Sequence, residues 1–461
     1  MRNRLLRLVA VTGLLATVAC GARLSDEQYV EARGAGTGGG GTAAGANRAA
    51  SGTGGGAAGA SATATATATG GAGGDAGAGE AAPAAAGGGP CSPQPTDAPG
   101  VTDTEIKLGN VSTISGPVQN FGATGRAGAK AYLDFVNNQG GVCGRKLALV
   151  NGDDRLDPGT NRSQTEQLKD QVFGFVGNTT VVDDGGADVI GGTNIPNCSL
   201  IIGNTALQQP NYYSPNPIAP AGDTNGTTAI WSWFKANKGI TKVGIVYPDN
   251  PNAFARVQGY VNDITNAGLV ADNPIKVAVT ESNYVGVANQ MKSNGDDALI
   301  TVLEVNGIGK LAQAIKQVGW EVKVPFYGAQ AYGPQVPQIA GANADGALIG
   351  LTHDIVEGGS QAMQTFAQFY QASSSGQPLD FFAIMGWTAA KLCVDAIAAA
   401  GPAPTRDSVI AALNGFVDYT ADNILAPRSP AAKQGATQFI VATIEGGAWK
   451  RVYPDSGFAA Q

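Results

Sequence analysis

Two stretches decide the fold of this chain: EIKLGNV at residues 105–111, and SGPVQNFGATGRAGAKAYLDFVNNQGGVCGRKLALVNGDDRLDP at residues 115–158. The first alternates and is apolar enough for a buried strand, and a Ser-Gly-Pro break follows it. Residues 119–138 then carry apolar side chains at helical spacing, and a glycine-rich turn leads from this helix to a second strand at 147–150. This order predicts an α/β fold with a parallel, doubly wound sheet.

The alternation of strands and helices continues along the chain. A proline-rich loop at 210–220 separates a first series, which ends in a strand at 199–202, from a second series that begins with a helix at 224–238. The strands expected in the second series are residues 242–247, 275–279, 298–303 and 325–328. Residues 439–444 and 449–453 then predict a closing hairpin.

The composition limits the classes of function. The roughly 360 residues that follow a low-complexity N-terminal region can bury a large core, and this length fits two lobes better than one. The net charge is −7 and 14% of residues are charged, with no basic run beyond the first residues, so no nucleic-acid partner is expected. Residues 381–400 are apolar, but Lys391 and Asp395 interrupt them, so this stretch predicts no membrane span.

The N-terminus predicts export. Three arginines precede an apolar run at residues 8–19 that is too short to remain as a membrane span, and the expected signal peptide covers residues 1–19. The run ends in TVACG, which resembles a lipoprotein box in which Cys20 becomes the lipid-modified first residue. The alternative is an accidental or buried cysteine near an ordinary cleavage site.

A tether is expected after the lipid site. Residues 34–89 are almost wholly Gly, Ala, Thr and Ser, with too few apolar side chains to offset the entropy of ordering. Residues 20–100 are therefore predicted to be a disordered, lipid-anchored tether. Such a tether would keep a globular domain near the outer face of the cytoplasmic membrane.

The quoted run at 115–158 resembles the opening of type I periplasmic substrate-binding proteins, in the leucine/isoleucine/valine-binding branch that serves ABC importers. The likeness spans most of residues 101–452. It implies two doubly wound parallel-sheet lobes joined by a multi-crossing hinge, and a monomer that captures a small molecule and delivers it to ABC permease subunits. The expected segments are 101–221 and 346–402 for lobe I, and 222–345 and 403–461 for lobe II.

The cysteines suggest disulfides. The chain has five, and setting Cys20 aside leaves four, which allow three connectivities in an exported domain. In the topology that the resemblance implies, Cys143 precedes the second strand near where Cys91 must lie, while Cys198 and Cys393 fall in the same lobe. The expected pairs are Cys91–Cys143 and Cys198–Cys393, and reduced thiols are the alternative.

Candidate ligand residues follow the strands of the first series, because ligands bind beyond the carboxyl ends of strands in open α/β sheets. Thr179 and Thr180 follow the third strand, and Asn204, Thr205 and Ala206 follow the fourth. The family uses hydroxyl and backbone groups at these places, and free N–H groups at a helix start could hold a ligand carboxylate. Simple N-capping is the alternative for each threonine.

The second series departs from the family pattern. Phe254 stands where the family commonly has Tyr, so stacking would survive but a hydroxyl contact would not. Glu304 and Asn306 end a strand at the same edge. Gln330 stands where amino-acid-binding members place an acid for the ligand ammonium, which makes a neutral or carboxylate-bearing ligand as plausible as an amino acid. The expected ligand is amino-acid-like, or a small carboxylate or amide. Asp183, Asp184 or Glu304 could supply the missing charge, and the alternative for each is a solvated helix-start or rim acid.

Enzyme chemistry is not expected. His353 is the single histidine, so no multi-histidine metal site can form and no catalytic residue is proposed. The chain carries no GxSxG, HExxH, CxxC or phosphate-loop motif, and no cofactor is expected. The residues favour a solute-binding lipoprotein. A ligand-sensing module for a membrane receptor and an exported hydrolase that depends on His353 are the alternatives.

Overall fold

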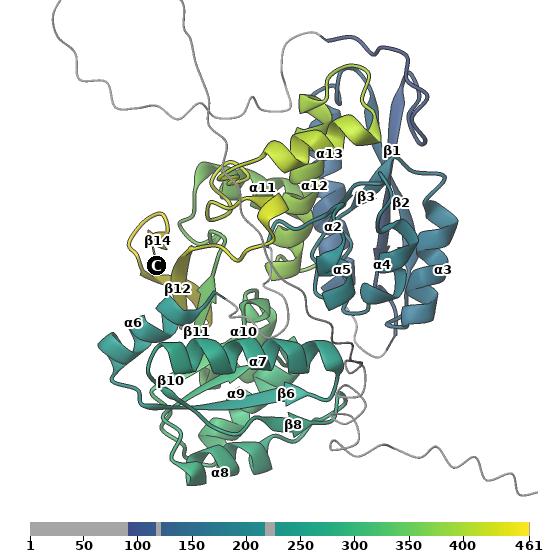
Figure 1. Ribbon diagram of the computed structural model, residues 1–461. Helices are drawn as coiled ribbons and strands as arrows, with labels where there is room; N and C mark the ends of the chain where they lie inside the picture. Colours follow the sequence, from purple (N-terminus) through teal and green to yellow (C-terminus); the bar gives the residue numbers. More distant parts are fainter. Residues whose placement is uncertain (1–90, 117–120, 217–225, 461) are drawn as a thin grey trace, which may run out of the picture. The chain divides into compact units, whose positions relative to one another are not determined.

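The computed structural model describes residues 91–116, 121–216 and 226–460 (Figure 1). The predicted signal peptide, Cys20 and the tether up to residue 90 lie outside the described residues. The α/β architecture with parallel sheets is confirmed, and it is built on two sheets that each have their own helices.

The first sheet is wholly parallel and has the order β2-β1-β3-β4-β5. Its strands are β1 (Glu105–Ser112), β2 (Lys146–Asp153), β3 (Gly174–Val176), β4 (Asn197–Cys198) and β5 (Tyr212–Tyr213). The connecting helices are α2 (Phe121–Asn138), α3 (Pro158–Leu168), α4 (Asp184–Ile190) and α5 (Asn204–Gln208). Burial of β1 on both faces explains why its sequence is a nearly continuous apolar run.

The second sheet is mixed, with the order β13-β12-β11-β10-β9-β6-β7 and with β8 and β14 paired to β6 and β12. Its parallel strands are β6 (Lys242–Pro248), β7 (Val270–Ala271), β8 (Ile275–Val277), β9 (Ala298–Thr301), β10 (Val324–Tyr327) and β11 (Leu348–Leu351). Its antiparallel strands are β12 (Gln438–Glu445), β13 (Ala448–Tyr453) and β14 (Ala459–Ala460). The helices between them are α6 (Thr228–Lys238), α7 (Pro251–Asn266), α8 (Val285–Asn294), α9 (Val305–Gln317) and α10 (Gln335–Ala340).

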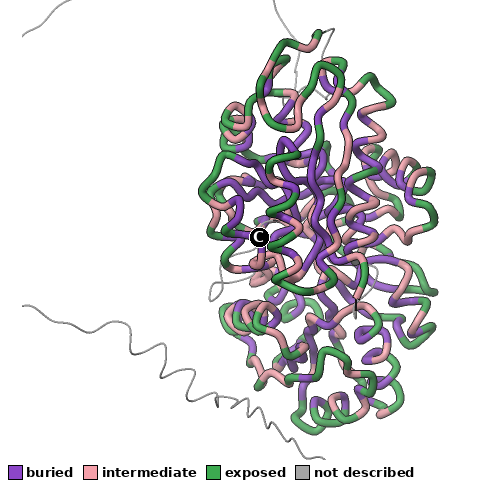
Figure 2. Tube along the Cα trace, turned by 90° about the vertical axis from the view of Figure 1, so that its right-hand side faces the viewer, coloured by how far each residue is buried: buried purple, intermediate pink, exposed green. Residues whose placement is uncertain are grey.

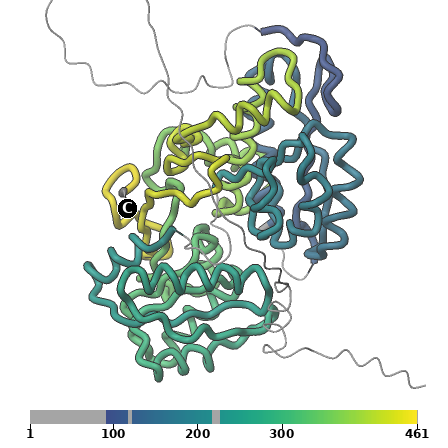
Figure 3. Tube along the Cα trace, in the orientation of Figure 1, coloured from purple at the N-terminus to yellow at the C-terminus, as the bar shows by residue number. Residues whose placement is uncertain are grey.

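Three later helices return to the first sheet: α11 (Gln361–Ser373), α12 (Phe381–Ala399) and α13 (Arg406–Gly415). The Trp387 ring of α12 lies 5.0 Å from the Tyr132 ring of α2. Gly386 lets the two helices approach closely, because a Cβ at this position would collide with the carbonyl oxygen of Gly125. Figure 3 follows the late chain, light green to yellow, from the first sheet to the second.

The predicted lobe boundaries are wrong at two places. The apolar strand β11, expected in lobe I, lies between β10 and β12 of the second sheet. Helix α13, expected in lobe II, lies on the first, where the Arg406 side chain donates from Nε to the Phe173 carbonyl oxygen at 2.9 Å. Hydrophobic pattern predicts a strand or helix but not the sheet that it joins. Lobe I below denotes the first sheet with α2–α5 and α11–α13, and lobe II the second sheet with α6–α10.

Burial follows the strands and the inward faces of the helices, as Figure 2 shows in purple. Helix α12 is long and apolar enough to cross a membrane by length and composition, but 83% of that stretch is buried inside the protein. It is therefore a core helix, whose Lys391 is neutralised by Asp395 at 3.0 Å.

Residues 91–100 are not part of a free tether, which corrects the predicted tether end. A disulfide joins Cys91 to Cys143, with 4.8 Å between the Cα atoms. The buried Arg145 side chain donates from Nη2 to the Gln94 carbonyl oxygen at 2.7 Å and from Nη1 to the Pro402 carbonyl oxygen at 2.7 Å. These contacts bind the segment to lobe I.

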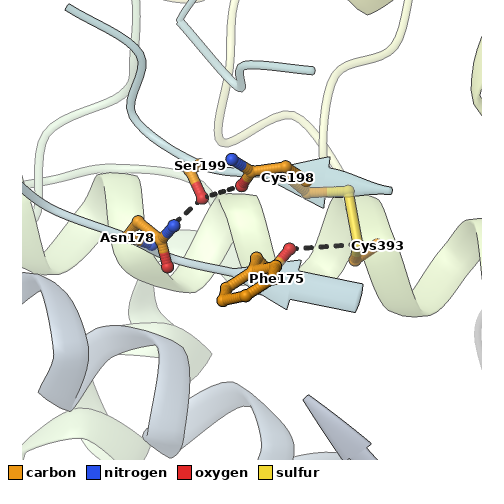
Figure 4. Close-up of a disulfide and its surroundings, with 6 residues drawn as sticks. Phe175, Asn178, Cys198, Ser199 and Cys393 are labelled. Carbon is orange, nitrogen blue, oxygen red and sulfur yellow. Dashed lines mark hydrogen bonds between the residues drawn. A yellow bond between two sulfur atoms is a disulfide. The ribbon is translucent and has the colours of Figure 1, made fainter. Parts of the chain in front are cut away.

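The second disulfide lies in the core of lobe I. It joins Cys198 of β4 to Cys393 of α12, with 5.7 Å between the Cα atoms (Figure 4). Beside it, the Ser199 hydroxyl donates to the Asn197 side chain and accepts from the Asn178 N–H group at 3.1 Å. The two pairs in the structure are the pairs that the sequence predicts.

The chain passes between the two sheets after β5, after β11 and after α13, and Arg428 holds these three passages together. Its guanidinium donates to the Asn216 side-chain oxygen at 3.1 Å and to the Thr352 carbonyl oxygen at 2.7 Å. Arg428 itself lies in the third passage, and its side chain is 4% exposed.

Candidate ligand-binding site

The candidate residues lie at the carboxyl ends of parallel strands in both lobes. In lobe I they follow β3 and β4, which are neighbours in the sheet. In lobe II they follow β6, β9 and β10, and β9 lies between the other two. The sheet order therefore brings the loops of each lobe together at one edge.

The two threonines after β3 are deeply buried and use their hydroxyls inside the protein. Thr179 and Thr180 are each 1% exposed. The Thr179 hydroxyl donates to the Gly177 carbonyl oxygen at 3.1 Å, and the Thr180 hydroxyl accepts from the Val182 N–H at 3.1 Å. Neither caps α4, whose N-cap residue is Asp183. Their hydrogen bonds fix the loop that carries Asp183.

The backbone donors after β4 bind carboxylates of the chain itself. The N–H groups of Ile202 and Gly203 donate to the Asp183 carboxylate at 2.9 Å each. The N–H group of Ala206 donates to Asp184 Oδ1 at 3.0 Å. In the structure, Asp183 and Asp184 therefore occupy these N–H groups.

Burial raises the pKa of Asp183 to about 7, although its backbone hydrogen bonds act in the opposite direction. The other residues of this loop differ in exposure: Asn204 is half-buried, Thr205 is exposed and Ala206 is buried. The Thr205 side chain thus remains open to solvent beside the two aspartates.

Helix α7 of lobe II contacts both loops of lobe I. The Asn252 side chain donates to the Val181 carbonyl oxygen at 2.9 Å, and one turn later Arg256 Nη2 lies 3.4 Å from the Ile202 carbonyl oxygen. Burial lowers the pKa of Arg256 to about 10, and the negative charge of Asp183 partly offsets this. The sequence analysis missed both residues. Their spacing of four on one helix, on either side of Phe254, was the available signal.

Phe254 is the exposed aromatic side chain of this helix start. Its side chain is 51% exposed, and its ring centroid lies 6.1 Å from that of Tyr247. An N-cap and a proline fix the start of this helix: the Asn250 side chain accepts from the Ala253 N–H at 2.8 Å, and Pro251 occupies the first turn. The ring is therefore available to stack on a planar or apolar group.

The remaining lobe II candidates meet at the ends of β9 and β10. Glu304 is the N-cap of α9, where its carboxylate accepts from the N–H groups of Asn306 at 2.7 Å and Gly307 at 2.6 Å. Gln330 donates from Nε2 to the Leu303 carbonyl oxygen at 3.1 Å. Asn306 is exposed. Glu304 is thus a helix-start acid in the structure, which is the alternative to a ligand-binding role.

His353 is away from these loops, in the second passage between the sheets. It is fully buried between the rings of Tyr332 and Phe381, and burial lowers its pKa to about 4. Its Nδ1 lies 2.7 Å from the Asp354 carbonyl oxygen. Within the described residues, no group of three or more His, Cys, Asp or Glu side chains could hold a metal ion.

Polar and aromatic groups from both lobes lie beyond strand ends, where ligands bind in open α/β sheets. A family model for periplasmic binding proteins matches residues 105–448. The chain belongs to the periplasmic binding proteins. The type I fold and the leucine/isoleucine/valine-binding branch expected from the sequence are confirmed, and this protein is a periplasmic ligand-binding protein of the ABC transporter type.

Three known proteins show the extent of the likeness. A Leu/Ile/Val-binding protein homolog 3 of Brucella melitensis biotype 1 is 21% identical over 67% of this chain and 83% of its own length. A fatty acid ABC transporter substrate-binding protein from Thermomonospora curvata has a TM-score of 0.69 at 20% identity, covering 79% of this chain and 94% of its own. A branched chain amino acid ABC transporter structure from Thermus thermophilus with bound valine has a TM-score of 0.66 at 16% identity, covering 78% of this chain and 97% of its own.

Proposed function

We propose that this periplasmic binding protein is a lipid-anchored, monomeric receptor that captures a small polar ligand between its lobes and delivers it to an ABC permease. The observation that carries the proposal is that Asn252 and Arg256 of lobe II contact the loops after β3 and β4 of lobe I. Family members are binding proteins, and the family implies an extracytoplasmic location.

The proposed mechanism is differential affinity. A ligand that touches both α7 and the lobe I loops is held by all its contacts only when the lobes are together, so binding shifts the population toward that state. The permease would recognise the shifted state. Phe254 would stack on the ligand, and the exposed polar side chains of Thr205 and Asn306 would orient it.

The ligand class in this proposal is amino-acid-like, or a small carboxylate or amide. The relatives bind different molecules: one has bound valine, and another is named for fatty acids. At these sequence identities the relatives show the fold alone. The ligand class must therefore be inferred from the residues of this chain. Gln330, in place of an acid, is the sequence feature that sets it apart from amino-acid binders.

A thermal-shift screen of the exported protein against amino acids, amides and small acids tests ligand capture. A ligand present at about one hundred times its Kd adds roughly 2.7 kcal/mol to the free energy of unfolding, which gives a clear rise in melting temperature. The absence of any shift across the whole library would contradict the proposal.

Anchoring and delivery need their own tests. Labelling with a radioactive fatty acid should mark the wild type and not a Cys20→Ser variant, and the variant should move from the membrane fraction to the soluble fraction. Loss of uptake of the identified ligand on gene deletion would support delivery. Unchanged uptake with a lost signalling response would favour the sensing alternative.

A further inference from the structure

Two carboxyl groups of the protein itself occupy the backbone donors of the loop after β4. Both carboxylates converge on Gly203, where a Cβ would collide with Asp184 Oδ1 and lie 2.9 Å from Asp183 Oδ1. The N–H groups of Ile202, Gly203 and Ala206 all donate to these two side chains. The position that could receive a ligand carboxylate therefore already holds two.

Asp184 is the nearest carboxyl group to Asp183 in this loop, and Arg256 is the nearby cation. Arg256 of lobe II supplies one guanidinium, whose Nη2 lies 3.4 Å from the Ile202 carbonyl oxygen. A ligand carboxylate placed here would meet like charge in a partly desolvated site, and like charges brought together in an interface cost several kcal/mol.

The same groups suit a ligand that donates hydrogen bonds. A carboxylate offers about four acceptor positions. Asp184 uses Oδ1 for the Ala206 N–H, so this side chain can accept further donors. A primary amide, an amine or a hydroxyl supplies such donors without adding negative charge.

We infer that the ligand presents an uncharged or cationic hydrogen-bond donor, and not a carboxylate, to the loop formed by Asp183, Asp184 and Ile202 to Ala206. Asp183 is then a specificity-determining residue, because it occupies the N–H groups of Ile202 and Gly203 that a ligand carboxylate would need. This inference rests on the proposed function and narrows its ligand class.

Matched acid and amide pairs test the inference by calorimetry on the full chain: isoleucine with isoleucine amide, benzoate with benzamide, and octanoate with octanamide. In the wild type, any pair that binds should favour the amide by at least about tenfold. A carboxylate that binds as tightly as its amide overturns the inference and leaves the proposed function standing.

The variant Asp183→Ala gives a second readout that does not require a known ligand. It frees two backbone donors and removes a carboxyl group, so benzoate, octanoate or isoleucine should gain at least about tenfold in affinity over the wild type. No gain for any of the three acids overturns the inference, whether or not the amides bind.

The matched control is Asp188→Ala on the same helix, because Asp188 is exposed and pairs with Arg162 at 2.5 Å instead of with the loop. It should leave acid and amide affinities unchanged.

If Asp183→Ala does not fold, Asp184→Asn keeps the Asp183 bonds and should still shift the preference toward the acid. The proposed function fails separately, when no compound of the broad thermal-shift library binds the wild type.

Discussion

His353 shows how burial determines the behaviour of one titratable group. Its ring is fully buried, and its pKa of about 4 lies below the ordinary value of 6.5. Below pH 6.5 the unfolded chain binds a proton that the folded protein does not, so stability falls as the pH decreases from about 6.5 to about 4. Above pH 6.5 this contribution is complete and constant.

The variant His353→Gln should therefore lose less stability in acid than the wild type does. Between pH 7 and pH 5 we expect the free energy of unfolding of the wild type to fall by about 2 kcal/mol more than that of the variant. Denaturant unfolding at both pH values measures the difference. Comparison with the variant removes the opposite effect of buried acids such as Asp380, whose pKa is raised to about 6. Parallel profiles for the two proteins would contradict the prediction.

Phe254 should contribute to binding and not to folding. Because its side chain is 51% exposed, Phe254→Ala should change the free energy of unfolding by no more than about 0.5 kcal/mol. Loss of a stacking contact should raise the Kd of the ligand found by the screen by about tenfold. The control is Val270→Ala, since Val270 is 58% exposed on β7. Equal Kd values for Phe254→Ala and the wild type would exclude Phe254 from the site.

At the scale of elements, the Cys91–Cys143 disulfide fixes an extended segment to lobe I. The two cysteines are 52 residues apart in sequence, and the bond limits the freedom of the unfolded chain over this span. Arg145 adds hydrogen bonds from inside the lobe. The segment would otherwise continue directly into the Gly/Ala-rich region.

Replacing both Cys91 and Cys143 by Ser should lower the free energy of unfolding by about 2–4 kcal/mol and expose residues 91–100 to protease. Ligand affinity should not change, because the bond lies at the opposite ends of β1 and β2 from the candidate site. Limited proteolysis with mass mapping measures the exposure. Replacing Cys198 and Cys393 by Ala is the comparison: it should destabilise the core without exposing residues 91–100.

At the scale of the whole molecule, Arg428 couples the passages between the sheets. Its hydrogen bonds reach Asn216 of the first passage and Thr352 of the second, and Thr352 in turn donates to Asn216 at 2.8 Å. A lysine has one nitrogen in place of a planar fork and cannot satisfy these acceptors together.

Arg428→Lys should therefore destabilise the protein by about 2–4 kcal/mol, since it leaves buried carbonyl groups without donors. The control Arg162→Lys changes an exposed ion pair and should have an effect of less than about 1 kcal/mol. Chemical denaturation of both variants compares them. Equal stability of Arg428→Lys and the wild type would show that other contacts hold the passages.

The sequence by itself determined the long strands, the helices and the family. Two short strands of the first sheet were missed: β4 lies at Asn197–Cys198 and not at 199–202, and β5 lies within the loop expected at 210–220. Alternating and apolar runs such as 105–111 and 242–247 are local signals, and β1 and β6 occupy these residues in the structure. The same signals identified the edge at which Thr179, Phe254 and Gln330 would lie, because strand ends follow from strand positions.

Only the tertiary structure decided which partners these elements take. The sheet that receives β11, the lobe that receives α13 and the acceptors of the Ile202 and Gly203 N–H groups all depend on residues far away in the chain. Asp183 lies 20 residues before Gly203 and reaches it only because the loops after β3 and β4 are side by side. Hydrophobic periodicity reports which face of an element is buried, whereas a hydrogen bond between loops depends on where the packed sheets place them.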